Sequence, residues 1–228
     1  MFEELDHAQT RFGELVLRRR DSPSLGGVVY EVMLGGEHLM SSQVHDSEIA
    51  LTRLGLRASR AAQGPVLVGG LGLGYTAAAA LDDEGTTGVT VIEALPEVID
   101  WHRNGLVPLG DQLTGDTRCS FVLADFFRHM AGPAETPHRA ILVDIDHAPD
   151  SLLHPDHAMF YDENGLGNVV NWLLPGGSFA LWSADAPTPG FLDAMQRTFA
   201  TCEVHEIDFD NPLTGDDRNF IITGVRAD

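Results

Sequence analysis

A short apolar strand that runs directly into a series of glycines is the feature that most limits what this chain can fold into. Residues 66–70 read VLVGG, and the chain continues LGLG before an alanine-rich stretch at 75–81 that favours a helix. Glycine is needed where the backbone adopts unusual dihedral angles or must approach a ligand without a Cβ in between. In open α/β sheets, ligands bind at the carboxyl ends of the strands. The sequence therefore predicts a ligand-binding turn formed by Gly69, Gly70, Gly72 and Gly74.

Acidic residues close the next two expected strands. Glu93 ends the strand VTVIE (89–93), 19 residues after Gly74, and Asp125 ends the stretch CSFVLAD. A carboxylate at the end of the second strand can accept hydrogen bonds from ribose hydroxyls. Asp125 is placed to accept a hydrogen bond from an adenine amino group. This order predicts a nucleoside cofactor, while the fit of residues 72–77 to the pattern GxGxxA keeps a dinucleotide as an alternative.

Strands alternate with helices along the rest of the chain. We expect strands at 140–146 and 178–183, and helices at 96–107, 158–174 and 191–200. Such alternation implies right-handed crossovers and a parallel sheet. The two closing strands, CEVHEIDF and NFIITGVRA, have no helix between them, so one of them is expected to run antiparallel. The expected fold class is α/β, with a Rossmann-like, seven-stranded, mostly parallel sheet.

The N-terminal quarter of the chain differs in pattern. Residues 12–20 and 28–40 read as strands, and Gly35-Gly36 within the second indicates a hairpin turn. Asp46 is positioned to cap a helix over 47–60. We therefore expect residues 1–62 to form a β-hairpin appendage with a connecting helix. Residues 63–228 are expected to form the Rossmann-like cofactor-binding and catalytic domain.

The net charge of the chain limits the kinds of molecule that it is expected to bind. The formal net charge is −20, which disfavours nucleic acid and anionic membranes and favours a cationic small molecule. The two cysteines have no metal-type spacing, and the N-terminus has neither the basic start nor the apolar run of a signal peptide. No apolar run approaches the ~20 residues of a membrane span. We expect a cytoplasmic protein without membrane contact, in which the edge hairpin could pair two copies into a homodimer.

Several of these segments, taken in order, resemble the spermidine synthase family of polyamine aminopropyltransferases. The resemblance runs through SQVHDSEIAL, the glycine turn, VIEALPEVIDWHRNGLVPLG, LADFF, ILVDIDHAPD and LLPGGSFALWS. It implies the sheet of class I S-adenosylmethionine-dependent methyltransferases, with S-adenosylmethionine or decarboxylated S-adenosylmethionine as the cofactor. It also implies that Gln43 or Ser41 matches a cofactor-binding glutamine of the family.

The resemblance further implies a catalytic centre at the end of the strand that contains Asp144. Asp144 matches the acid that holds and deprotonates the amine in the family, and Asp146 and His147 lie beside it. Tyr161 and Trp182 are expected to line the acceptor pocket. No metal is expected, because the next strand end, Trp182-Ser183-Ala184-Asp185, lacks the asparagine of magnesium-dependent catechol-type enzymes.

Departures from the family pattern bear on the reaction. Gly72 stands where the family has the aspartate that holds the amine of the decarboxylated cofactor, and residues 49–52 lack the family's Tyr-His pair. Asp144-Ile145-Asp146-His147 replaces the family pattern D-S-S-D. From the sequence we therefore favour methyl transfer to an amine or hydroxyl over aminopropyl transfer. A non-catalytic adenosine-nucleoside binder is the alternative of another class.

Overall fold

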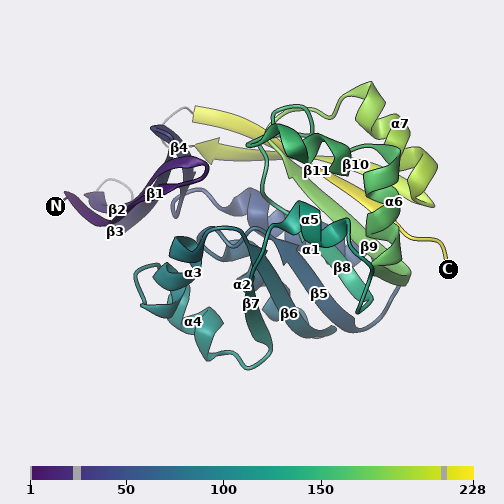
Figure 1. Ribbon diagram of the computed structural model, residues 1–228, viewed down its shortest axis with the longest axis horizontal. Coiled ribbons are helices and arrows are strands. Elements are labelled where there is room, and N and C mark those ends of the chain that lie inside the picture. Colours follow the sequence, from purple (N-terminus) through teal and green to yellow (C-terminus); the bar gives the residue numbers. More distant parts are fainter. Residues whose placement is uncertain (1, 23–26, 212–214) are drawn as a thin grey trace.

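Two β-sheets organise the chain (Figure 1). The computed structural model describes residues 2–22, 27–211 and 215–228. The N-terminal sheet is antiparallel and is built from β1 (Phe2–Thr10), β2 (Gly13–Ser22), β3 (Gly27–Leu34) and β4 (Glu37–Ser41). The expected β appendage is confirmed, but it is a four-stranded sheet. Strand β1 was missed because its sequence, FEELDHAQT, is mostly polar and it pairs with a neighbour along one edge only.

The second sheet carries the predicted α/β core. Its strands are β5 (Gly64–Gly69), β6 (Thr86–Glu93), β7 (Cys119–Leu123), β8 (His138–Val143), β9 (Leu173–Ser183), β10 (Thr201–Asn211) and β11 (Gly215–Val225). They lie in the order β10-β11-β9-β8-β5-β6-β7, and β11 runs antiparallel to both neighbours. The seven-stranded, mostly parallel sheet and the antiparallel closing strand are thus confirmed. This is the class I methyltransferase fold.

Helices cover both faces of the central sheet (Figure 1). They are α1 (Asp46–Ala58), α2 (Tyr75–Leu81), α3 (Pro96–Arg103), α4 (Gly110–Gly115), α5 (Phe126–Met130), the 3-10 helix η2 (Pro155–Phe160), α6 (Glu163–Asn171) and α7 (Pro189–Thr198). The single helix expected over 158–174 is two helices. They are separate because the Asp162 side chain accepts a hydrogen bond from Gly165 N at 2.8 Å and so caps a new helix. Asp46 does not cap α1; it is the first helical residue, and the N-cap residue is His45.

Alternating side chains divide the core into two layers. Successive residues of a strand point to opposite faces. In β8, Leu142 packs in the layer that contains α1 and α2, whereas Ile141 and Val143 pack in the layer that contains α6 and α7. All three side chains are fully buried. Both faces of the strand are covered, which explains its continuous apolar sequence.

The N-terminal sheet is attached to the central sheet through α3. Trp101 Nε1 donates a hydrogen bond to Oδ2 of Asp6 at 2.6 Å. Helix α1 continues from this sheet and packs against the central one, where a Cβ on Gly55 would come within 2.6 Å of the Leu142 side chain. The division of the chain after residue 62 stays a prediction. Within the described ranges, no helix has the length and apolar character needed to cross a membrane.

Candidate functional site

The glycine turn brings three strand ends together. Gly69 O accepts a hydrogen bond from Asp144 N, and Gly70 N donates one to Ile92 O, each at 3.0 Å. Gly70 has a φ of 91°, in the left-handed region, and a Cβ there would clash with the carbonyl oxygen of Asp144. Glycine is therefore required at residue 70. As a result, the ends of β5, β6 and β8 meet at one point.

The rest of the turn is held by α3 and β4. Gly72 O accepts a hydrogen bond from Nε2 of His102 at 2.9 Å, and Met40 of β4 lies against Gly72. Gly74 is the N-cap residue of α2, with a φ of 94°. A Cβ on Gly74 would come within 2.6 Å of Leu113. These glycines therefore have a packing role in addition to the expected role next to a ligand.

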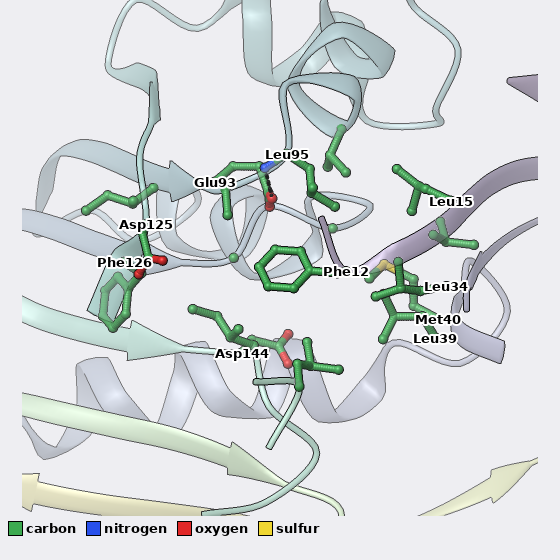
Figure 2. A pocket seen from close by; sticks show the side chains of 18 of the residues that line it. Phe12, Leu15, Leu34, Leu39, Met40, Glu93, Leu95, Asp125, Phe126 and Asp144 are labelled. Carbon is green, nitrogen blue, oxygen red and sulfur yellow. Dashed lines mark hydrogen bonds between the residues drawn. The ribbon is translucent and has the colours of Figure 1, made fainter. Parts of the chain in front are cut away.

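Glu93 lies beside the turn at the end of β6. Its carboxylate accepts a hydrogen bond from Leu71 N at 3.0 Å. It accepts a second one from Leu95 N at 2.8 Å (Figure 2). Burial raises the pKa of this carboxyl group, while the backbone N–H donors oppose the rise. Each oxygen still has acceptor capacity left for a ligand hydroxyl. A group that binds Glu93 would therefore contact the same carboxylate that accepts a hydrogen bond from the backbone of the turn.

Asp125 ends the loop after β7 and caps α5. Its Oδ1 accepts a hydrogen bond from Arg128 N at 3.2 Å, and its Oδ2 lies 3.3 Å from Nη2 of Arg11. Arg11 belongs to the tip of the β1–β2 hairpin, 114 residues away in sequence. Both carboxylate oxygens thus already have a partner.

A small cavity of about 100 Å³ lies between these groups. Figure 2 shows the ring of Phe12, at the tip of the hairpin, between Glu93 on one side and Asp144 on the other. The lining is mostly apolar and includes Leu15, Leu34, Leu95, Trp101, Phe126 and Ile145. Ligand pockets typically enclose ≈ 300–1,000 Å³. A nucleoside therefore fits only if the Phe12 side chain moves aside.

A larger cavity of about 380 Å³ adjoins the first, and both cavities are lined by Gly70, Gly72 and Asp144. The predicted residues that line it are Gln43, Gly70, Gly72, Gly74, Asp144, Asp146, His147 and Trp182. The cavity is also lined by Tyr75, Phe209 and Asn219. The structure thus brings together most of the residues expected at the reacting end.

Glu48 is a site residue that the sequence analysis missed. It lies on α1 and lines the larger cavity together with Asp144. Burial, and secondarily the charge of Asp144, raise the pKa of Glu48 to about 7. Burial likewise raises the pKa of Asp144 to about 6, against a hydrogen bond from the Thr76 hydroxyl at 3.4 Å. The one feature of the sequence that could have indicated Glu48 is its position, as an acidic residue on the helix that follows the hairpins.

Asp146 forms a buried network with residues further along the chain. It is 3% exposed and accepts hydrogen bonds from Leu153 N, His157 Nδ1 and Tyr161 Oη, each at 2.8 Å. Tyr161 lies elsewhere than expected: it is 6% exposed in the aromatic core, and it lines neither cavity. Its neighbours there are the rings of Phe127, Phe160 and Phe191. A role for Asp146 in the reaction stays a prediction.

The remaining predicted residues differ in their surroundings. His147 is exposed, and its carbonyl oxygen accepts a hydrogen bond from Ala184 N at 2.7 Å. Nε2 of Gln43 and Nε1 of Trp182 are buried without a partner among the described residues, so both could donate to a ligand. In the described ranges, no three His, Cys, Asp or Glu side chains gather as a group that could hold a metal ion.

Comparisons with known proteins bear on the fold. No protein-family model matches the sequence, and no curated protein matches it. Solved structures of spermidine synthases match 98% of this chain. One, in complex with the transition-state analogue AdoDATO, has a TM-score of 0.77 at 17% identity, with 74% of that chain covered. Another, from Thermotoga maritima, has a TM-score of 0.74 at 15% identity, with 73% covered.

A probable spermidine synthase from Corynebacterium glutamicum ATCC 13032 has a TM-score of 0.66 at 15% identity, and 79% of that chain is covered. Since the matches span 98% of the present chain, they include its N-terminal sheet as well as its central sheet. The fold implied by the sequence resemblance is therefore confirmed.

Proposed function

We propose that this chain is a transferase that moves an aminopropyl group from decarboxylated S-adenosylmethionine to a small cationic amine. The charge of the larger cavity carries the proposal. The acids Glu48, Asp144 and Asp146 line it, and no arginine does among the described residues of its wall. The methionine part of S-adenosylmethionine would bring a carboxylate into these surroundings without a cationic partner. The decarboxylated form brings only positive charge.

This proposal revises the preference drawn from the sequence. Methyl transfer was favoured because Gly72 replaces the aspartate that holds the cofactor amine in the spermidine synthase family. Glu48 places a carboxylate in the same cavity from a different element. Opposite charges at close range in a partly desolvated cavity attract more strongly than they do in water. Glu48 can therefore replace the missing aspartate as the group that holds the amine.

The nucleoside part would be held by the groups around the smaller cavity. Glu93 has free acceptor capacity for ribose hydroxyls, and the glycine turn leaves the backbone accessible next to it. When bound, a sulfonium of this kind supplies an electrophilic carbon from which a neutral thioether departs. The protein therefore needs no strong acid for the leaving group, and its main contribution is to position the two partners.

Asp144 is suited to prepare the acceptor. An attacking amine must be neutral, so a base has to remove its proton first. The raised pKa of Asp144, about 6, makes its carboxylate a better proton acceptor than an ordinary aspartate near neutral pH. Asp144 can thus hold the ammonium form of the acceptor and then accept its proton. Trp182 and Phe209 line the same cavity and can pack against the methylene groups of such an amine.

Calorimetric titration of the whole chain with each cofactor, followed by product analysis with a series of diamines, tests the proposal. We expect tighter binding of the decarboxylated form and release of 5′-methylthioadenosine only when an amine is present. Preferential binding of S-adenosylmethionine with release of S-adenosylhomocysteine would restore methyl transfer as the leading function. Binding of either without turnover would favour a non-catalytic nucleoside binder. Binding of neither would refute the proposal.

Replacing Glu93 tests the ribose position separately. We expect Glu93→Ala to weaken nucleoside binding by about 1–3 kcal/mol, as for the loss of a hydrogen bond to a charged group. Glu84→Ala is the control, because Glu84 is an exposed carboxylate in the turn after α2 and does not line the smaller cavity. Unchanged affinity in Glu93→Ala would exclude Glu93 as the ribose-binding acid.

A further inference from the structure

The buried network around Asp146 fixes the hydrogen-bonding state of His157. Nδ1 of His157 lies 2.8 Å from Oδ1 and 3.1 Å from Oδ2 of Asp146. Tyr161 Oη and Leu153 N donate to the same carboxylate. An ionised carboxylate can only accept hydrogen bonds, so Nδ1 of His157 must carry a proton and donate it. In the neutral ring, Nε2 is then unprotonated and is a hydrogen-bond acceptor.

The acceptor nitrogen of His157 has no partner in the protein. The residue is 5% exposed, and its ring stacks on Phe127 with centroids 3.9 Å apart and planes inclined by 25°. No hydrogen bond to Nε2 occurs among the described residues, and Nε2 is not among the fully enclosed unpaired atoms. The side chain lines both the smaller cavity and an open cavity of about 800 Å³ between α5 and α6. Nε2 is thus a fixed acceptor available to a ligand.

The position of His157 connects it to the base of a bound nucleoside. The smaller cavity is lined by Glu93, by Asp125 and Phe127, and by His157. If Glu93 binds the ribose, the base extends toward Asp125 and Phe127. Each oxygen of Asp125 already accepts one hydrogen bond within the protein, from Arg128 N or from Arg11. Nε2 of His157 adds an acceptor at this end of the cavity, and no described group donates to it.

We propose that His157, oriented by Asp146, accepts a hydrogen bond from the 6-amino group of adenine and thereby selects adenine over 6-oxopurines. The inference rests on the proposed nucleoside site, and it makes His157 a specificity residue and Asp146 its positioning residue. A 6-oxopurine would place a carbonyl oxygen where the amino group donates. Two acceptors would then face each other. A site built to hydrogen-bond a ligand group rejects analogues that leave its polar groups unpaired.

Titration of 5′-methylthioadenosine and 5′-methylthioinosine into the purified chain tests the inference. We expect the native protein to prefer the adenine compound, and we expect His157→Phe to reduce that preference about three- to tenfold, the range for one hydrogen bond. His154→Phe is the matched control, since His154 lines the same open cavity but its side chain interacts with the backbone N and the carboxylate of Asp156 in its own turn. An unchanged preference in His157→Phe would overturn the inference. Binding of neither nucleoside to the native protein would instead refute the proposed function.

A measurement on the native protein covers the case in which His157→Phe fails to fold. Long-range ¹H–¹⁵N spectra of histidine-labelled protein report which ring nitrogen carries the proton. We expect an unprotonated Nε2 in His157, and a change in its ¹⁵N shift on adding 5′-methylthioadenosine that 5′-methylthioinosine does not produce. A protonated Nε2, or equal changes with both nucleosides, would overturn the inference.

Discussion

Glu48 of α1 and Asp144 at the end of β8 line one cavity, and the charge of Asp144 adds to burial in raising the pKa of Glu48 to about 7. The two residues are 96 positions apart in the sequence. Like charges in a partly desolvated space favour the protonated form of a carboxyl group. A cation placed between them would relieve this repulsion, which is why the pair suits an amine.

The carboxyl pair gives the stability of the protein a defined pH dependence. A raised carboxyl pKa means that the folded state binds protons more tightly, so this contribution is complete below about pH 4, the unfolded pKa range. It is lost as the pH rises through about 6 and about 7, the folded values of Asp144 and Glu48. We expect the melting temperature to fall across this range, and to fall less in Glu48→Gln. Thermal unfolding from pH 4 to 8 measures both slopes.

Glu84→Gln is the control for that comparison, because Glu84 is an exposed carboxylate in the turn after α2. It should leave the slope as in the native protein. If Glu48→Gln also leaves the slope unchanged, Glu48 and Asp144 do not interact in the way described.

Phe12 is expected to compete with the nucleoside for space. Its ring lies between Glu93 and Asp144 (Figure 2), and the remaining cavity is about 100 Å³. A binding site that is open only part of the time shows reduced apparent affinity. We expect Phe12→Ala to bind 5′-methylthioadenosine about two- to tenfold more tightly. Calorimetry measures this, with Phe2→Ala, an exposed ring at the other end of β1, as the control. Weaker binding would show that the ring forms part of the wall around the bound nucleoside.

Alanine substitutions at Gly70, in the glycine turn, and at Gly36, in the turn between β3 and β4, distinguish the cost of the backbone angle from the cost of a steric clash. Both have a positive φ, 91° and 87°, but a Cβ on Gly36 meets nothing within 4 Å, whereas a Cβ on Gly70 meets the Asp144 carbonyl oxygen. Gly36→Ala should cost about 1–2 kcal/mol for the left-handed backbone alone. Gly70→Ala should cost clearly more, as measured by urea denaturation. Equal losses would show that the close approach of β5 and β8 is not a constraint.

Tyr161 is expected to stabilise the folded state through its hydrogen bond to Asp146. Burial, the charge of Asp146 and the hydrogen bond to it raise the pKa of Tyr161 well above its ordinary value, so its hydroxyl stays protonated as a donor. Removing this donor from a buried carboxylate in Tyr161→Phe should lower the free energy of unfolding by about 1–3 kcal/mol. Tyr75→Phe, which loses a 3.3 Å hydrogen bond to Ser42 O at a half-buried position, should cost less. Urea denaturation of both variants measures the two losses of free energy of unfolding. Equal losses would show that the hydrogen bond to Asp146 stabilises the fold no more than an ordinary half-buried one.

Local sequence determined the framework of this protein. The continuous apolar stretch of β8 requires a strand covered on both faces, and the glycine at residue 70 follows from a backbone angle that other residues avoid. Glu93 could be placed at a strand end because strand length and alternation are local properties. Each of these features depends on residues close together in the chain, so each could be predicted without a structure.

The tertiary structure alone decided which distant side chains share a space. Glu48 faces the cavity of Asp144 because α1 packs across the central sheet, and Phe12 enters the smaller cavity because the first hairpin folds back over the strand ends. His157 reaches Asp146 from a 3-10 helix that begins at Pro155, before the start of the single helix expected over 158–174. The physical reason is the same in each case: the pairing depends on how elements pack, and packing is set by the whole core.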